Sequence, residues 1–491
     1  MKLKKIYIQK FKILDNLIID FSNDSLNDIS VLIGENGAGK TTVFEAILEI
    51  FSCLLFDLKS KFTFSLEYSI TRNEISLDST SWGTSNTVNF DVKIEGMIDD
   101  FLLMSVILPN GKVLGSISEI NTDVALTRLY SHLPSNIYKV IPDNIVVYYS
   151  GTSDVLKNVV IKHIDQFKTN SKKGITNIPQ VLFYYEPTLF KIVLLSLLSY
   201  EYGDIPSFLK EKAKIDQLLR VKLFFKRPSG SNAKLIDQWN TQGQAKLLFD
   251  FLDEKREVWN TDKRGQLEIN FNVTLNSHEY VFQLKDLFRE ERELFNVFYA
   301  LYVDDYLEDI EFQFANGDTV FNNLSEGEQQ AITIRGLIEL LSEENSLFLY
   351  DEPDTYLHPK WQQDFLGEIY QFNKSNINQE ANFLITTHSP MLLSTFKNGD
   401  IFSLQNGKSF LFKESTYGKE INTILKQTMN SLTRVKEIDD KIIKIEKYIN
   451  ENRFVDAKEL ILELGKLMDD SDDAQIIRLL SIIKRKEIIG R

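Results

Sequence analysis

Eight residues near the start of the chain, Gly34–Thr41, have the types and the spacing of a phosphate-binding loop. They fit the pattern G-x-x-x-x-G-K-[ST], in which the glycines allow backbone N–H groups to surround phosphate oxygens. We expect Lys40 to reach the β- and γ-phosphates of ATP and Thr41 to bind Mg²⁺ through its hydroxyl group. A chance glycine-rich turn is the alternative. The residues expected to contact the nucleotide in this segment are Asn36, Gly37, Gly39, Lys40, Thr41 and Thr42.

Two carboxylates and a histidine follow apolar segments in the second half of the chain. Asp351 and Glu352 come directly after Ser346–Tyr350, and His388 follows Phe383–Thr387. Asp351 is placed to bind Mg²⁺ through water, and Glu352 to accept a proton from the water that attacks the γ-phosphate. His388 is placed to hydrogen-bond the γ-phosphate or to orient that water. One histidine is usually structural, but here it accompanies a phosphate loop and a carboxylate pair.

A short polar segment, Leu324–Gln330, precedes a helical pattern and offers a third candidate contact with the nucleotide. Ser325 is a favourable N-cap, and Glu328 three residues later completes a capping box. A structural cap explains these residues without any ligand. The functional alternative is that the helix N-terminus presents Ser325 and the Gly327 amide to an anion.

The phosphate loop and the acidic pair require parallel strands to position them. Ile29–Ile33 is apolar throughout, as expected for a buried parallel strand, and Thr42–Phe51 has helical spacing. Leu3–Gln9 alternates in the manner of an edge strand, and Leu14–Phe21 is expected to return beside it. The predicted fold class is therefore α/β, with a mixed β-sheet core.

The predicted secondary structure changes twice in the middle of the chain. Alternating residues between positions 58 and 150 predict an antiparallel β layer, with a hairpin turn at Pro109–Lys112. A mostly helical pattern follows, and it includes Phe208–Phe225. The predicted parts are an N-terminal lobe with the phosphate loop (1–57), the β layer (58–150), a mainly helical insert (151–265), a C-terminal lobe with Ser325, Asp351 and His388 (266–415) and a helical tail (416–491).

Composition limits the classes of function that remain. The chain has 491 residues, a formal net charge of −14 and a single cysteine, Cys53, which excludes an intrachain disulfide. No stretch approaches the roughly 18 consecutive apolar residues of a membrane span, so we expect a cytoplasmic protein with no membrane contact. Basic residues gather locally and offer DNA a contact, although the acidic total favours solvated loops. They are Lys168, Lys172, Lys173, Lys226, Arg227 and Lys234.

The phosphate loop, Leu324–Gln330, the acidic pair and His388, in this order, resemble the ATP-binding-cassette (ABC) ATPases. The resemblance covers Met1–Phe51 and Ile310–Leu404, and Leu324–Gln330 matches the family signature, with Glu326 where glycine is commonest in transporters. It implies a P-loop ATPase head that binds ATP and Mg²⁺ and sandwiches two ATP molecules in a head-to-tail homodimer. By that resemblance Ser325 and Gly327 act in trans, and Glu328 belongs to the same nucleotide-binding segment.

Two further segments narrow the resemblance. Pro353–Pro359 looks like the corresponding run in bacterial overcoming-lysogenization-defect and related AAA-type defence ATPases, which implies that Asp354 and His358 lie on a dimer-facing loop. The tail, from Tyr417 through Arg434 to a final Arg-Lys-Glu-Ile, resembles the PtuA ATPases of Septu and retron-linked anti-phage systems. Such proteins work with a separate HNH nuclease, PtuB. The implied function is an ATPase switch or sensor subunit that controls a nuclease.

Two other classes of function remain open. An ATPase of DNA repair or chromosome structure, resembling SMC proteins, would act as a mechanical clamp, but the chain has no long heptad run for an extended coiled coil. A scaffold that binds ATP without hydrolysing it would not need Glu352. The tail lacks a plausible toprim carboxylate cluster, so we expect no nuclease activity in this chain itself.

Overall fold

A computed structural model gives the structure of the chain. Among the residues that it describes, no helix combines the length and apolar character that a bilayer crossing requires. The described residues are 1–21, 28–56, 58–74, 86–107, 113–117, 141–172, 181–199, 203–215, 218–227, 239–254, 259–261, 267–272, 290–314, 324–375, 381–397, 399–429, 434–468 and 473–489.

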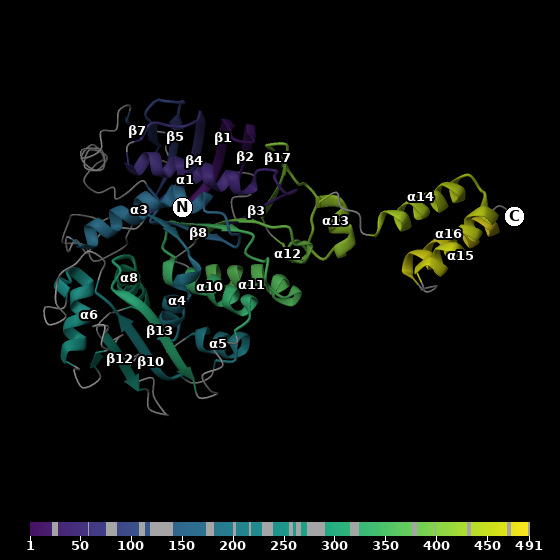
Figure 1. Cartoon of the computed structure of the whole chain (residues 1–491). Coiled ribbons are helices and arrows are strands. Elements are labelled where there is room, and N and C mark those ends of the chain that lie inside the picture. The colour runs from purple at the N-terminus through teal and green to yellow at the C-terminus, as the bar shows by residue number, and fades with distance from the viewer. Residues whose placement is uncertain are drawn as a thin grey trace. The chain divides into compact units, whose positions relative to one another are not determined.

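A seven-stranded mixed sheet forms the centre of the chain, with the order β17-β16-β3-β15-β14-β8-β9. All neighbouring pairs are parallel except β16 and β17, so the carboxyl ends of β3, β15 and β14 lie at one edge of the sheet. Figure 1 labels β3, β8 and β17 of this sheet. This arrangement confirms the α/β fold class with a mixed sheet. The strands are β3 (Ile29–Gly34), β8 (Asn144–Tyr149), β9 (Leu182–Tyr184), β14 (Ser346–Asp351), β15 (Asn382–Thr386), β16 (Asp400–Gln405) and β17 (Lys408–Leu411).

A second, antiparallel sheet has the order β2-β1-β4-β5-β6-β7. Four of its strands, β4 to β7, lie within residues 58–150, and β1 and β2 come from the N-terminal segment. The expectation of an edge strand at Leu3–Gln9 is wrong, because β1 pairs with β2 on one side and β4 on the other. Alternation reports which face is buried, not how many neighbours a strand has. Pro109–Lys112 lies outside the described residues. The strands are β1 (Lys2–Phe11), β2 (Leu14–Asp20), β4 (Phe64–Glu74), β5 (Asn86–Gly96), β6 (Leu103–Ile107) and β7 (Val113–Ile117).

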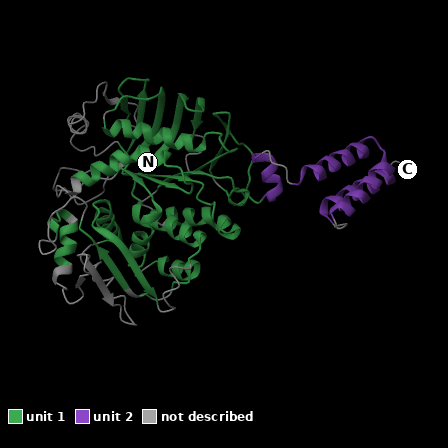
Figure 2. Cartoon of the chain, viewed as in Figure 1, with its two compact units in different colours: residues 1–418 green, residues 419–491 purple. Residues whose placement is uncertain are grey.

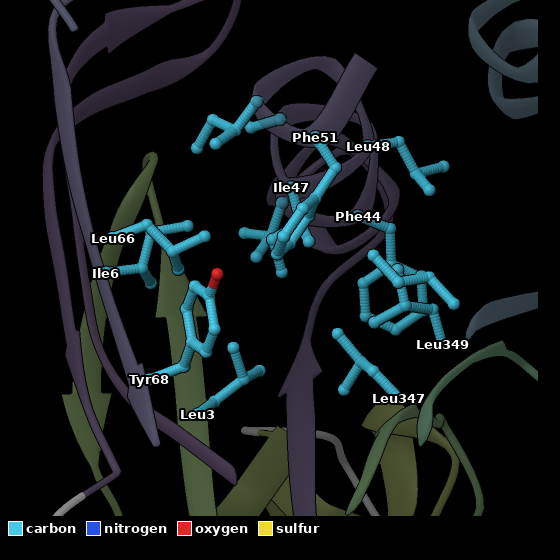
Figure 3. Packing of buried hydrophobic residues seen from close by; sticks show 14 of the residues in the cluster. Leu3, Ile6, Phe44, Ile47, Leu48, Phe51, Leu66, Tyr68, Leu347 and Leu349 are labelled. Atoms are coloured by element: carbon cyan, nitrogen blue, oxygen red, sulfur yellow. The ribbon is translucent and has the colours of Figure 1, made fainter. Parts of the chain in front are cut away.

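Helix α1 (Lys40–Phe56) lies between the two sheets and joins them through one apolar cluster (Figure 3). Each fully buried large side chain contributes roughly 1.5–3 kcal/mol relative to exposure, so this packing firmly holds the helix that follows the phosphate loop. The cluster includes Leu3, Ile6, Leu66 and Tyr68 from the antiparallel sheet, Phe44, Ile47, Leu48 and Phe51 from α1, and Leu347 and Leu349 from β14.

The chain also contains further helices and a four-stranded antiparallel sheet with the order β11-β12-β10-β13. The helical expectation for Phe208–Phe225 is only half right, because Leu218–Phe225 forms strand β10. Leu218, Val221, Leu223 and Phe225 are all buried, and the last three alternate in the pattern of a strand. The helices are α3 (Val155–Lys172), η1 (Pro187–Leu189), α4 (Phe190–Leu197), α5 (Ile205–Ala213), α6 (Gly243–Glu254), α8 (Glu291–Val303), α10 (Glu326–Leu341), α11 (Pro359–Ser375) and α12 (Pro390–Ser394), and the strands are β10 (Leu218–Phe225), β11 (Trp259–Thr261), β12 (Leu267–Asn272) and β13 (Leu307–Phe314).

The chain divides into two compact units, residues 1–418 and 419–491 (Figure 2). The second unit contains α13 (Ile421–Met429), α14 (Lys436–Asn450), α15 (Phe454–Met468) and α16 (Ala474–Ile489). The apolar residues of α14, α15 and α16 pack against one another in a cluster of their own, as the periodicity predicts. The finer division of the first unit at residues 57, 150 and 265 stays a prediction.

Candidate functional site

The phosphate loop connects the end of β3 to the first residue of α1, which is Lys40. Gly39 has a φ angle of 107°, and a Cβ atom there would lie 2.8 Å from Cδ2 of Leu14, so only glycine fits this position. Asn36 and Gly37 are exposed at the turn, and Thr41 and Thr42 are partly buried. The unpaired amides of the first helical turn give this loop a positive potential that suits an anion.

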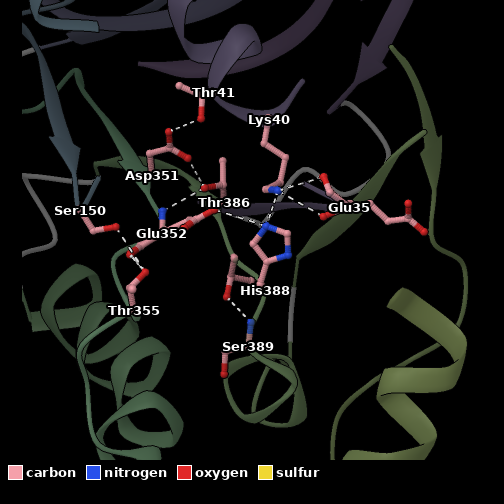
Figure 4. Close-up of polar contacts among 12 residues, drawn as sticks. Glu35, Lys40, Thr41, Ser150, Asp351, Glu352, Thr355, Thr386, His388 and Ser389 are labelled. Carbon is pink, nitrogen blue, oxygen red and sulfur yellow. Dashed lines mark hydrogen bonds and ion pairs between the residues drawn. The ribbon is translucent and has the colours of Figure 1, made fainter. Parts of the chain in front are cut away.

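The ammonium group of Lys40 lies at the centre of the site, with only 6% of the residue exposed. It donates to the carbonyl oxygens of Gly34 and Glu35 at 3.2 and 3.5 Å, and lies 2.5 Å from Nε2 of His388 (Figure 4). Burial lowers the pKa of Lys40, while the carboxylates of Glu352 and Asp351 act in the opposite direction. The geometry brings the loop cation and the predicted histidine into direct contact.

Asp351, fully buried at the end of β14, is held by two threonine hydroxyls (Figure 4). Thr41 Oγ1 donates to Asp351 Oδ2 at 2.6 Å, and Thr386 Oγ1 donates to Oδ1. Burial raises the pKa of Asp351, and the two hydroxyl hydrogen bonds oppose that change. The first helical turn and the acidic strand therefore meet through Thr41 and Asp351, the two residues predicted to bind the metal.

Those two residues suit Mg²⁺, which prefers oxygen donors and commonly takes one or two protein ligands besides phosphates and water. Within the described part of the chain, no group of three or more His, Cys, Asp or Glu side chains gathers as a metal site. A Thr hydroxyl and one carboxylate, adjacent to a phosphate-binding loop, match a metal that arrives with a nucleotide. The donor set does not match a permanently bound ion such as structural zinc.

Glu352 adopts a left-handed backbone conformation, with a φ angle of 52°. Such a conformation is strained for a residue other than glycine and persists only where surrounding contacts hold it. Here the Glu352 N–H donates to Thr386 Oγ1 at 2.9 Å, while the Glu352 carboxylate lies 3.3 Å from Nε2 of His388. The hydrogen bond with His388 lowers the pKa of Glu352, which keeps the side chain in the carboxylate form that a proton acceptor needs.

Nε2 of His388 faces both Lys40 and Glu352, but it can serve only one of them at a time. With a proton it donates to the Glu352 carboxylate, and without one it accepts from the Lys40 ammonium. The imidazole therefore has two alternative partners of opposite charge. When another acceptor binds the Lys40 ammonium, Nε2 of His388 becomes available to Glu352.

The predicted signature residues lie at the N-terminus of α10, where they form the expected capping box. Ser325 Oγ accepts from the Glu328 N–H at 3.3 Å, and the Ser325 N–H donates to Glu328 Oε2 at 2.8 Å. Gly327 packs so tightly that a Cβ atom would lie 2.7 Å from the carbonyl oxygen of Tyr356. Ser325 is exposed, and its contacts with a nucleotide stay a prediction.

Sequence reasoning missed one contributor to the site, Thr386, and expected another, Asp354, to be more exposed than it is. Thr386 was not assigned a role, although it donates to Asp351 and accepts from the Glu352 N–H. Its position two residues before His388, on the strand beside the acidic one, was the available signal. Asp354 is not on an exposed face, because only 4% of it is accessible. His358 is exposed, as expected.

The remaining candidates from the sequence are the basic residues that offer DNA a contact and the single cysteine. Lys226 forms an ion pair with Asp305 at 2.8 Å, whereas Lys173 and Lys234 lie outside the described residues. Cys53 is buried, and burial raises the pKa of its thiol to about 11, so it is an unreactive core residue.

A phosphate loop after one strand, an Asp-Glu pair after a second and a histidine after the strand between them define the class of P-loop ATPase domains. The model of the AAA ATPase domain family matches residues 1–393. The chain therefore belongs to this AAA ATPase domain family.

Three curated relatives share low sequence identity with the chain. The Retron Ec83 probable ATPase of Escherichia coli is 29% identical over 149 residues, which are 28% of this chain and 26% of the relative. The Retron Vc95 probable ATPase of Vibrio cholerae serotype O1 biovar El Tor is 22% identical over 483 residues, 91% of this chain and 83% of the relative. The Septu protein PtuA of Bacillus mycoides (strain KBAB4) is 27% identical over 105 residues, 20% and 14% respectively.

Among solved structures, the SMC head domain from Thermotoga maritima matches with 12% identity and a TM-score of 0.33. The match covers 84% of this chain and 98% of that structure.

Proposed function

We propose that this chain binds and hydrolyses Mg²⁺-ATP at the edge formed by β3, β15 and β14. The observation that carries the proposal is the meeting of Lys40, Thr41–Asp351 and Glu352–His388, from three separate parts of the sequence, within hydrogen-bonding distance of one another (Figure 4). These are the parts that phosphoryl transfer to water needs: a phosphate cation, a metal position and a proton acceptor.

The roles of the side chains follow from their chemistry. Lys40 exchanges its carbonyl acceptors for oxygens of the β- and γ-phosphates. Thr41 and Asp351 would hold Mg²⁺, which would neutralise phosphate charge. Glu352 accepts a proton as water oxygen bonds to the γ-phosphorus and the bond from that phosphorus to the bridging oxygen breaks, releasing ADP. His388, no longer engaged by Lys40, donates from Nε2 to Glu352 or to the γ-phosphate.

A second copy of the chain completes the site in our proposal. Ser325, Gly327 and Glu328 of one subunit contact the ATP held by the other, in a head-to-tail homodimer. The exposed Ser325 and the N-terminus of the 16-residue helix α10 support this assignment, because aligned peptide dipoles favour an anion at that end.

The biological role that we propose is a cytoplasmic switch or sensor subunit of a bacterial anti-phage defence complex that controls a separate HNH nuclease. The relatives named as retron ATPases and Septu PtuA support this role, together with the tail pattern from Tyr417 to Arg434. We also propose that the head is divided into a β layer and a helical insert. A DNA clamp resembling SMC proteins is the second candidate, and the match to an SMC head carries no weight at its TM-score.

The ATPase proposal is tested by phosphate release from ATP with the purified chain. We expect turnover with Mg²⁺ and its loss with EDTA, since phosphate charge is then no longer neutralised. Turnover that is independent of both Mg²⁺ and Lys40 contradicts the proposal. The defence role is tested by plaque assays with the chain and a neighbouring HNH nuclease gene expressed together or singly. Full protection by either gene alone contradicts the two-component model.

A further inference from the structure

Asp354 is a buried carboxylate close to Glu352 that the chemistry above does not use. Its Oδ2 accepts a hydrogen bond from Thr387 Oγ1 at 2.8 Å, whereas its Oδ1 is buried and has no hydrogen-bond partner in the structure. A half-satisfied buried carboxylate is unfavourable for folding, and burial raises the pKa of Asp354 to about 6. Its presence therefore calls for an explanation other than stability.

The contact between Asp354 and Thr387 belongs to a closed ring of hydrogen bonds. Thr387 Oγ1 accepts from the Ser389 N–H at 2.8 Å, and Ser389 Oγ donates to Gln362 Oε1 at 2.8 Å. Gln362 Nε2 then donates to the carbonyl oxygen of Asp354 at 2.9 Å, which closes the ring. The ring joins the segment after β14 to the segment after β15.

Those two segments carry the residues proposed for proton transfer. Thr387 directly precedes His388, and Asp354 lies two residues after Glu352, so the ring ties the two backbones together beside the 3.3 Å contact between Glu352 Oε1 and His388 Nε2. On the other side, Thr386 binds both Asp351 and the Glu352 N–H. The strained φ angle of Glu352 is therefore held from both sides.

We propose that Asp354 is a positioning residue, which acts through Thr387 to align His388 with Glu352 for ATP hydrolysis. This inference rests on the proposed ATPase function. The ring requires an oxygen acceptor at the Asp354 side chain, not a negative charge. An asparagine satisfies that requirement with its amide oxygen, whereas an alanine does not.

Steady-state ATPase assays on paired variants test the inference. We expect Asp354→Ala and Thr387→Val to lower kcat about 10- to 100-fold with KM unchanged, because a small misplacement of reacting groups has that effect. Asp354→Asn should restore kcat close to the wild-type value. The matched controls remove buried hydrogen bonds elsewhere. Asn373→Ala removes one at the start of β15, and Thr333→Val removes one to Tyr185, and both should leave kcat unchanged.

An NMR readout of His388 makes the test independent of turnover. In protein labelled with ¹³C at histidine Cε1, the His388 signal is identified by its loss in His388→Asn. We expect its chemical shift to change in Asp354→Ala and Thr387→Val, but not in Asp354→Asn or in the controls. Thr387→Val preserves side-chain volume, so it carries the test if Asp354→Ala does not fold.

The outcomes separate this inference from the proposed function. Active wild-type protein whose kcat and His388 signal are unchanged by Asp354→Ala and Thr387→Val overturns the positioning role and leaves the ATPase proposal standing. Wild-type protein that does not hydrolyse Mg²⁺-ATP overturns both. A kcat as low in Asp354→Asn as in Asp354→Ala also contradicts the inference. According to the inference, the ring needs an oxygen acceptor at this position and not a negative charge.

Discussion

Two parts of the chain follow opposite rules of construction. One is the nucleotide edge, formed by the ends of β3, β15 and β14, where we propose that ATP binds. The other is the C-terminal helical unit, residues 419–491. In the helical unit, Ile445 and Leu464 are fully buried in a purely apolar cluster, and an ion pair such as Lys458–Glu487 lies outside it. At the nucleotide edge, Lys40 and Asp351 are buried, and Glu352 has a left-handed backbone.

The difference indicates where the chemistry resides. Buried charges and strained backbones lower the stability of the folded chain. They nevertheless concentrate at functional sites, where surrounding contacts hold them. The helical unit has no buried charged residue among its described residues, and its left-handed residue, Asn452, is of a type that tolerates this conformation. Its regular apolar stripes pack against one another. We therefore expect substitutions at the nucleotide edge to alter activity more than stability, and substitutions in the helical cluster to do the reverse.

Among the substitutions that test this comparison, Lys40→Ala should have the largest effect, which is a loss of ATP affinity. The variant removes the cation that faces the phosphates, so ATP affinity should fall by about 100-fold or more, since charge-assisted contacts are the strong ones. Isothermal titration calorimetry with Mg²⁺-ATP measures the change. Lys61→Ala, which removes a surface lysine paired with Glu49, is the control and should bind normally. Equal affinities in both variants would remove Lys40 from the site.

Ser325→Arg should abolish most turnover by placing a bulky side chain at the proposed interface between subunits. Mixed with Lys40→Ala protein, it should regain partial activity, because one of the two composite sites in each heterodimer is then intact. ATP-dependent dimerisation is followed in parallel by light scattering. The absence of both recovered activity and an ATP-dependent dimer would contradict composite sites.

Ile445→Ala should affect the helical unit and leave the ATPase rate unchanged. The residue is fully buried, so the variant should destabilise that unit by about 2–5 kcal/mol. Ile443→Ala, on the same helix but 59% exposed, is the matched control. Limited proteolysis and ATPase assays on both variants check the expectation. A tenfold loss of turnover in Ile445→Ala would mean that the two units are not functionally separable.

Asp354→Asn should show the smallest effect, and one that depends on pH. Because the pKa of Asp354 in the folded chain is raised to about 6 from an ordinary value of 3.8, folding favours the neutral form and the residue lowers stability as pH rises from about 4 to about 6. Glu352 adds to this shift and His388 opposes it. The asparagine variant should gain on the order of 2–3 kcal/mol over wild type between pH 4 and pH 7. Chemical denaturation at both values measures the gain, and a constant difference would contradict the raised pKa.

The sequence predicted the chemical residues better than their supports. The phosphate loop, Asp351, Glu352 and His388 can be predicted to lie together because each follows an apolar segment, and parallel strands bring their ends to one edge. The alternation of Leu3–Gln9 does not report strand neighbours, so it predicts an edge strand where β1 in fact has a neighbour on each side. The short apolar segment Leu218–Phe225 fits both the helical and the strand period, so its pattern predicts a helix where the structure has strand β10.

The contacts of Thr386 and Asp354 could not be predicted, for a different reason. Thr386 reaches Asp351 from 35 positions along the chain, and Thr387 reaches Asp354 from 33. Such contacts depend on the register of β14 against β15, which pairs Asp351 with Thr386. No local pattern specifies that register. The tail helices needed no such information, because each stripe by itself specifies its buried face.

Single-turnover hydrolysis by Glu352→Gln tests the central claim most directly. The glutamine keeps the size of the side chain but cannot accept the proton, so we expect ATP binding to remain and the hydrolysis rate to fall by about 10²- to 10⁴-fold. Rapid-quench measurement with labelled ATP, alongside a binding titration, gives both quantities. A variant that binds ATP and hydrolyses it at the wild-type rate would contradict the assignment of Glu352 as the proton acceptor and, with it, this account of the site.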